Sequence, residues 1–172
     1  GVTVSPATGY EFDKWTGDPA VAVTLNGGDE VTYTASFKPA SFGYTVKYFI
    51  DEDEIDAATV AANGWTTGGT AEYGTTASVT PSPTATIAET NYMLESTNHS
   101  VTIDADATKN VINVVYTKDS IGTNPDPNTP DGVADKYQAT IKYAAGANGT
   151  VAGTTTRVVT LVDAQRNPAA SQ

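Results

Sequence analysis

The sequence predicts a mainly β protein, with at most one short helix near residues 55–62. Thr supplies about a sixth of the chain, and β-branched residues suit the half-buried, pleated surface of a sheet. Several runs alternate apolar and polar residues with the period of a strand. Glycines and prolines punctuate these runs, as turns between short strands require. At 172 residues, the chain fits one ordinary domain or two small ones.

The first segment, residues 1–40, contains two candidate strands. The aromatic-rich run 9–15 precedes Asn26-Gly27-Gly28-Asp29, whose residues tolerate the positive φ of a tight turn. Apolar residues then alternate with Thr and Ser from 31 to 37, which predicts a half-buried strand.

The second segment, residues 44–118, is the longest predicted module. Residues 44–50 alternate as a strand does, and an acidic cluster follows them. The stretch 55–62 is long enough for two helical turns, which Asn63-Gly64 would end. Further strands are predicted at 75–80, 100–104 and 110–116.

The third segment, residues 119–136, is rich in Pro, Asp and Asn and has the composition of an extended, semi-rigid linker. The fourth segment, residues 137–172, opens with an alternating run at 137–143. Asn148-Gly149 is a strong hairpin signal, and residues 156–162 read as the returning strand.

Composition excludes several classes of function. The net charge of −11 argues against nucleic acid and anionic membranes as partners. Without cysteine, the chain cannot form disulfides or use a catalytic thiol. The single histidine, His99, lies in a polar stretch that predicts a solvated turn, so we expect no enzyme activity. No apolar run reaches the length of a membrane span, and the absence of a signal peptide favours an excised piece or mature segment.

Three runs stand out in the second segment: YTVKYF at 44–49, GTAEYGT at 69–75 and KNVINVVYTKD at 109–119. Together they resemble the mucin-binding-protein (MucBP) type repeats of Gram-positive bacterial surface proteins. The prolines within residues 81–86 depart from the smoother run of that pattern.

The first and fourth segments carry a second resemblance. The runs GYEFDKW at 9–15 and YTASFKP at 33–39 resemble the second half of an internalin-type B-repeat, and residues 137–162 are similar to its first half. Such repeats form small β-grasp-like modules strung along cell-wall-anchored adhesins. The resemblance therefore implies tandem β-grasp-like or β-sandwich modules that form a stalk or mediate adhesion. It also implies a location at the extracellular surface of a Gram-positive bacterium and no catalytic residues.

The order of the two half-repeats predicts how they are completed. Residues 137–172 followed by residues 1–39 would read as one continuous repeat, as expected of a piece cut from a tandem array. We expect the halves to complete each other as one mixed sheet, within one chain or with a neighbouring chain, because an isolated hairpin is marginal in water. Adjacent repeat modules are thus the expected partners, with a host glycoprotein or glycan as a further candidate.

Oxygen-bearing side chains in the linker make a candidate calcium site. They alternate with other residues, and Gly132 stands where a sharp turn would need it. The predicted ligands are Asp126, Asn128, Asp131 and Asp135. The Asn128-to-Asp131 step breaks strict alternation, and the neighbouring prolines stiffen the loop, so a plain Pro/Asp linker is the favoured alternative and no other cofactor is expected.

Trp15 and Tyr10 are the candidate binding residues. Glu11, Asp13 and Asp18 lie near Trp15 in the sequence, and carboxylates beside an aromatic ring could serve glycoside chemistry. An aromatic ring that anchors a small core explains Trp15 equally well and is favoured. The overall reading is a non-catalytic repeat segment of a surface adhesin or stalk. The alternatives are a module that binds glycan or host protein, or an accessory domain of a secreted glycosidase.

Overall fold

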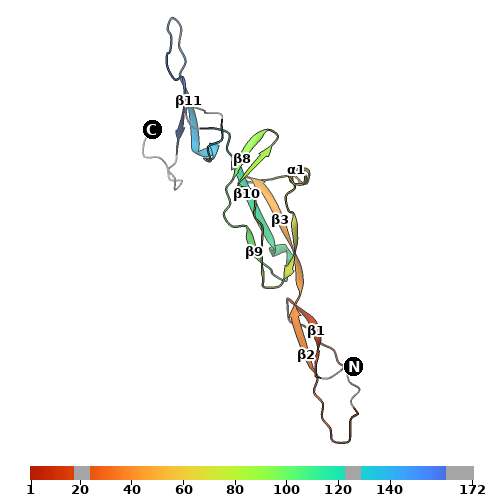
Figure 1. Cartoon of the computed structure of the whole chain (residues 1–172). Coiled ribbons are helices and arrows are strands. Elements are labelled where there is room, and N and C mark those ends of the chain that lie inside the picture. Colours follow the sequence, from red (N-terminus) through yellow and green to blue (C-terminus); the bar gives the residue numbers. More distant parts are fainter. Residues whose placement is uncertain (18–23, 123–128, 162–172) are drawn as a thin grey trace. The chain divides into compact units, whose positions relative to one another are not determined.

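The computed structural model describes residues 1–17, 24–122 and 129–161. The protein is mainly β, with 42% strand, 8% helix and several small sheets, which confirms the predicted fold class (Figure 1). It forms two compact units. One comprises Gly1–Val46, Thr66–Val79 and Ser100–Ile112, and the other comprises Lys47–Trp65, Thr80–His99 and Asn113–Gln172.

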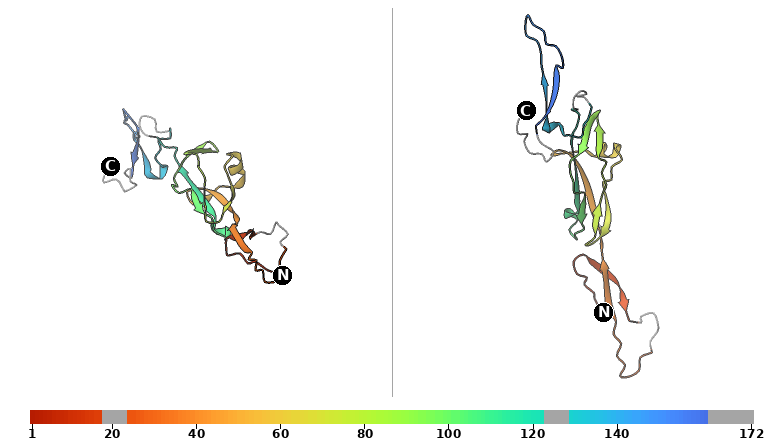
Figure 2. Two further views of the ribbon diagram at one scale, coloured as in Figure 1. Left: turned by 60° about the horizontal axis from the view of Figure 1, so that its bottom comes forward. Right: turned by 60° about the vertical axis from the view of Figure 1, so that its left-hand side comes forward.

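The first hairpin is the two-stranded antiparallel sheet of β1 (Tyr10–Thr16) and β2 (Thr34–Pro39). The two strands lie side by side in every view (Figure 2). Phe12 lies opposite Phe37 and Trp15 lies opposite Ala35, with a shift of register between Phe12 and Lys14. This bulge inserts one residue, so it returns Trp15 to the face that carries Phe12.

The largest sheet has the strand order β4-β3-β10-β8-β7, and β5 also pairs with β3. Its longest strands bury alternate side chains, among them Val46 and Tyr48 on β3 and Val114 and Tyr116 on β10. A separate small sheet pairs β6 with β9. The bounds are β3 (Ser41–Ile50), β4 (Asp53–Glu54), β5 (Gly68–Glu72), β6 (Thr76–Ser78), β7 (Thr84–Ile87), β8 (Thr90–Leu94), β9 (Ser100–Thr102) and β10 (Val111–Lys118).

The one α-helix of the described residues is α1 (Ala57–Ala62), inside the stretch predicted for it. The Asp56 side chain caps its first turn by accepting a hydrogen bond from the Thr59 N–H at 2.9 Å. Val60 is its buried residue, and Asn63 ends it. Two 3-10 turns, η1 (Ala107–Lys109) and η2 (Asp135–Tyr137), complete the helical content. No helix in the described ranges is long and apolar enough to cross a membrane.

The second hairpin pairs β11 (Gln138–Lys142) with β12 (Thr156–Thr160). Asn148 adopts the positive φ of 65° that its position in a predicted turn requires. The first and second hairpins are separate two-stranded sheets, so the described residues show no mixed sheet between them within one chain. Completion by a neighbouring chain stays a prediction.

Candidate functional site

The first hairpin carries an aromatic face. The bulge between Phe12 and Lys14 puts four aromatic side chains on this face: Tyr10, Phe12, Trp15 and Phe37. The Phe12 ring lies 5.8 Å from the Trp15 ring and 6.2 Å from the Phe37 ring, measured between centroids. Tyr10 is 43% exposed and Phe37 is 41% exposed, so this face is open to a partner.

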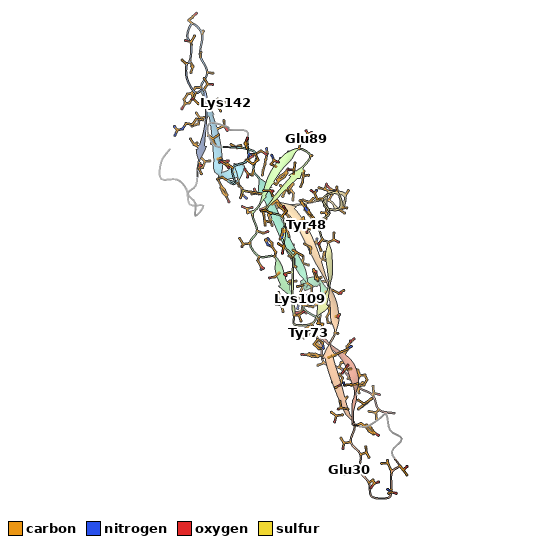
Figure 3. The ribbon with its side chains drawn as sticks, viewed as in Figure 1. Glu30, Tyr48, Tyr73, Glu89, Lys109 and Lys142 are labelled. Atoms are coloured by element: carbon orange, nitrogen blue, oxygen red, sulfur yellow. The ribbon has the colours of Figure 1, made fainter. Side chains whose placement is uncertain are left out.

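Tyr73 fixes the first hairpin within its unit. Its ring packs edge-on against Tyr10, with centroids 5.7 Å apart, and against Phe42, at 6.4 Å (Figure 3 labels Tyr73). The backbone of Gly9 runs directly beneath the ring, since a Cβ atom built there would lie 2.5 Å from it. Two backbone hydrogen bonds through Ala40, with Gly9 and with Tyr73, reinforce the contact.

The two predicted binding residues, Tyr10 and Trp15, therefore do share one face. The acidic residues near them in the sequence are held elsewhere: Glu11 forms an ion pair with Lys38 at 3.2 Å, and Asp13 accepts a hydrogen bond from the Ser36 hydroxyl at 3.3 Å. Asp18 lies outside the described residues. The register places Glu11 and Lys38 opposite each other, between the aromatic positions and on the other face of the sheet.

The other tryptophan, Trp65, has a packing role. Its ring stacks on Tyr48 at 4.7 Å and on Tyr116 at 5.3 Å. Burial raises the pKa of Tyr116 to about 12, with the nearby Tyr48 adding to the shift, and the Tyr116 hydroxyl donates to the Ser82 carbonyl at 2.8 Å. Trp65 thus packs on the large sheet, whereas Trp15 lies on a face with exposed aromatic side chains.

Asp119 organises the segment that follows β10. Its two carboxylate oxygens accept hydrogen bonds from the backbone N–H groups of Asp131 at 3.2 Å and Gly132 at 3.0 Å. The side chain is buried, and burial raises the pKa of Asp119; the two N–H donors lower it, and the charges of Asp131 and Asp135 raise it again. The described ends of the predicted linker are therefore hydrogen-bonded to each other.

The predicted calcium ligands fall on both sides of the described boundary. Asp126 and Asn128 lie outside the described residues. Asp131 accepts from the Val133 N–H at 2.9 Å and from the Gln138 side-chain amide at 2.8 Å, and Asp135 accepts from two backbone N–H groups. Within the described ranges, no group of three or more acidic, His or Cys side chains is arranged to hold a metal ion. Calcium binding stays a prediction.

Lys136 joins η2 to the large sheet. Its Nζ lies 2.9 Å from Asp51 Oδ1 and 2.8 Å from Glu95 Oε1, and Thr117 donates to the same Asp51 oxygen at 2.7 Å. Partial burial acts to raise the pKa of Asp51, but the hydrogen bonds from Lys136 and Thr117 outweigh it and lower that pKa. For Lys136, partial burial acts to lower the pKa, and its bonds to Glu95 and Asp51 raise it overall. Both groups therefore favour their charged forms.

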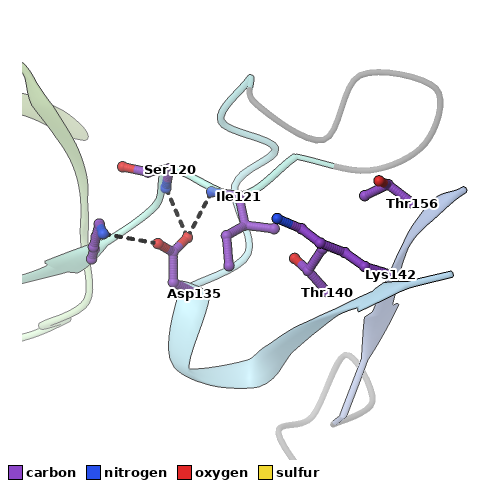
Figure 4. Close-up of a pocket in the computed structure, with 7 residues that line it drawn as sticks. Ser120, Ile121, Asp135, Thr140, Lys142 and Thr156 are labelled. Atoms are coloured by element: carbon purple, nitrogen blue, oxygen red, sulfur yellow. Dashed lines mark hydrogen bonds and ion pairs between the residues drawn. The ribbon is translucent and has the colours of Figure 1, made fainter. Parts of the chain in front are cut away.

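A pocket of about 500 Å³ opens at Asp135, the residue before Lys136 in the sequence (Figure 4). It is lined by Lys118, Ser120, Ile121, Asp135, Thr140, Lys142 and Thr156. Asp135 accepts hydrogen bonds from the Ser120 and Ile121 N–H groups and forms an ion pair with Lys118 at 3.8 Å. Its carboxylate therefore interacts with other residues that line the pocket. Sequence reasoning missed this pocket, because its residues come from separate segments without a shared motif.

His99 lies in the short connection between β8 and β9. Its Nε2 is 2.9 Å from the Ser96 hydroxyl, and that hydroxyl also accepts a hydrogen bond from the Val115 N–H at 2.9 Å. The pair thus fastens this connection to β10.

The chain was also compared with known proteins. No family model, no curated protein and no solved structure matches it.

Proposed function

We propose that this chain is a non-catalytic repeat segment of a bacterial cell-surface protein, which spaces modules along a stalk and presents an adhesive face. Small sheets with local cores suit such a role, because tandem modules add length without requiring one large core. The resemblances of residues 44–119 and of the two half-repeats to surface-protein repeats support the extracellular, cell-wall-anchored setting.

The aromatic face of the first hairpin is the observation that carries the adhesive part of the proposal. Large aromatic side chains dominate protein recognition, since they bury much area at small entropic cost. Here Tyr10 and Phe37 stay more than a third exposed on a two-stranded sheet. Trp15, which lies beside Phe12 on the same face, would be covered together with them by one partner.

Retention of coated beads tests this proposal. Beads that carry the full chain are washed over surfaces coated with mucin or with albumin. We expect selective retention on mucin, and roughly tenfold less retention for Trp15→Ala, the scale of a lost contact worth about 1.4 kcal/mol. Thr34→Ala, on the opposite face of the same hairpin, is the matched control and should behave as the original chain. Equal retention on mucin and albumin would contradict an adhesive role.

A glycan is the second candidate ligand, and the exposed rings of Tyr10 and Phe37 on the face of Trp15 are the observation that favours it. Aromatic rings offer an apolar surface with a polar rim to ligands such as sugars. If mucin retention depends on glycan, then deglycosylated mucin should no longer hold the beads, whereas a protein ligand would survive the treatment. This reading also fits an accessory domain of a secreted glycosidase.

A further inference from the structure

Two faces of this chain are apolar and include exposed side chains. The first is the aromatic face of the first hairpin, defined above. The second lies on the second hairpin, where Ile141 is 37%, Tyr143 50% and Leu161 42% exposed. Ile141 pairs directly with Arg157, and strand alternation puts Tyr143 and Leu161 on the same face as this pair. We call this second surface the aliphatic–arginine face.

Each face belongs to an isolated two-stranded sheet. All four strands, β1, β2, β11 and β12, pair on one side only within the described residues. A two-stranded sheet with one uncovered apolar face is marginally stable in water, and a covering layer stabilises it. Both sheets therefore have the same physical need, and among the described residues both still expose large apolar side chains.

The chemistry of the two faces is complementary. Arg157 has no carboxylate within ion-pair distance among the described residues, and neither has Lys142 on the same hairpin. An arginine surrounded by aliphatic groups suits an aromatic surface, because the guanidinium stacks on ring faces while the aliphatic groups pack around it. The aromatic face supplies such rings at Phe12, Trp15 and Phe37.

The net charges of the two hairpin segments are also opposite. Residues 1–39 contain five acidic residues and two lysines, a net charge of −3. Residues 137–172 contain one lysine, two arginines and one aspartate, a net charge of +2. Opposite charges speed and orient association, whereas like hairpins would repel each other.

We propose that the aromatic face of one copy of this chain packs on the aliphatic–arginine face of a second copy. The contact is heterologous, so a pair of copies still has one free face of each kind, and the association continues as a head-to-tail row. This inference deepens the proposed function, on which it rests for its biological setting, by naming a second copy of the chain as a partner. Such rows would join neighbouring stalks laterally through non-covalent contacts.

Sedimentation of the full chain over a concentration series is the first measurement. We expect the mean mass to rise without a plateau at dimer between roughly 10 µM and 1 mM, the range of a small, weak interface. A mass that stays at one chain across the range would overturn the inference. A plateau at two chains would overturn it as well, since it would indicate a closed, symmetric contact.

A mixing experiment with two charge-bearing variants identifies the faces. Phe37→Glu disables the aromatic face, and Ile141→Glu disables the aliphatic–arginine face, both at exposed positions. Each variant alone should stay monomeric. The mixture should form dimers and nothing larger, because each partner retains one intact face of the required kind. If Phe37→Glu or Ile141→Glu associates alone, or if the mixture stays monomeric, the proposed pairing is wrong.

Matched controls place the same charge on the other side of each hairpin. Thr34→Glu and Thr140→Glu should both keep the concentration-dependent rise in mass, and circular dichroism should show unchanged strand content for all four variants. Loss of association in the control variants would show that the added charge, and not the face, decides the result. Adhesion of beads without self-association overturns this inference alone. Self-association without adhesion supports it and contradicts the adhesive function.

Discussion

The two hairpins are both two-stranded sheets, but different forces fix each to its own unit. The first hairpin is held by rings: Tyr73 packs on Tyr10 and Phe42, directly over the backbone of Gly9. The second is held by charge: η2 places Lys136 between the carboxylates of Asp51 and Glu95. Asp51 itself adopts a positive φ of 51° at the end of β3, a conformation that its bonds to Lys136 and Thr117 stabilise.

This difference implies different responses to the solvent. Apolar packing depends little on pH and is not screened by salt. The Lys136 cluster is partly exposed, so salt screens it, and its strength depends on the protonation of Asp51. The second hairpin should therefore detach under conditions that leave the first in place.

The largest expected effect is at Gly9. Gly9→Ala adds a methyl group 2.5 Å from the Tyr73 ring at a φ of +84°, and together the overpacking and the backbone strain should cost roughly 2–4 kcal/mol. Chemical denaturation followed by tryptophan fluorescence measures the loss. Gly28→Ala is the matched control, because Gly28 has a φ of +96° and no atom near the added group. An equal loss in both variants would show that strain, and not Tyr73, sets the cost.

The next effect is at Asp119. Asp119→Ala leaves the partly buried Asp131 and Gly132 N–H groups without their acceptor, and should cost about 1–3 kcal/mol. Asp119→Asn keeps one acceptor oxygen and should lose less. Hydrogen exchange of β11 should rise in Asp119→Ala while that of β1 is unchanged. Exchange that rises equally in both strands would break the comparison between the hairpins.

The pH dependence of the second hairpin follows from the Lys136 cluster. The folded-state pKa of Asp51 is lowered, so its contribution is complete above its ordinary value of 3.8 and is lost as the pH falls through the folded pKa. The pKa of Lys136 is raised, so its contribution is complete below 10.5 and is lost as the pH rises through the folded pKa. Asp119 acts oppositely to Asp51, because protonation of a carboxyl whose pKa is raised favours the folded state.

We therefore expect protection of β11 and β12 amides to fall in strong acid, after correction for intrinsic exchange rates, while protection of β1 and β2 persists. Added sodium chloride at neutral pH should likewise lower the protection of the β11 and β12 amides and leave that of the β1 and β2 amides unchanged. Protection that declines in parallel for both hairpins would mean that global unfolding, and not the Lys136 cluster, limits exchange.

The smallest effect concerns a third hairpin, β7–β8, whose turn is unfavourable. Ala88 and Glu89 have φ values of 46° and 64°, and two-residue turns of this kind favour Asn or Gly (Figure 3 labels Glu89). Glu89→Gly should raise the free energy of unfolding by up to about 1 kcal/mol. Thermal unfolding measures the gain. A lower melting temperature would show that the Glu89 side chain has a role that the turn geometry does not reveal.

The strands with regular alternation could be predicted from the sequence. The run at 44–50 became β3, the run at 110–116 became most of β10, and Asp56 and Asn63 bracket the predicted helix. The strands β7 and β8 were missed, because prolines precede them and their turn contains neither Gly nor Asn. Local patterns indicate secondary structure only where turn chemistry is ordinary.

The sites depend on contacts that a local pattern does not contain. Trp15 and Tyr10 could be placed on one strand, but strand alternation predicts opposite faces for them, and the bulge that brings them to one face has no signal in the sequence. Lys136 and Asp51 are 85 residues apart, and no motif connects them. The sequence predicts Asn110 only as the first residue of a strand. In the structure its buried side chain donates to the carbonyls of Gly43 and Asp104 and accepts from the Asp104 N–H. Such roles become visible only when the fold brings distant segments together.

A crossed experiment on the two attachments tests the difference between the hairpins most directly. Tyr73→Ala removes the ring that holds the first hairpin, and Lys136→Met removes the charge that holds the second while keeping an unbranched side chain. Hydrogen exchange is measured for the amides of both hairpins in each variant at neutral pH. We predict faster exchange in β1 and β2 for Tyr73→Ala alone, and in β11 and β12 for Lys136→Met alone. Faster exchange of both hairpins in either variant, or of neither, would contradict separate attachment by packing and by charge.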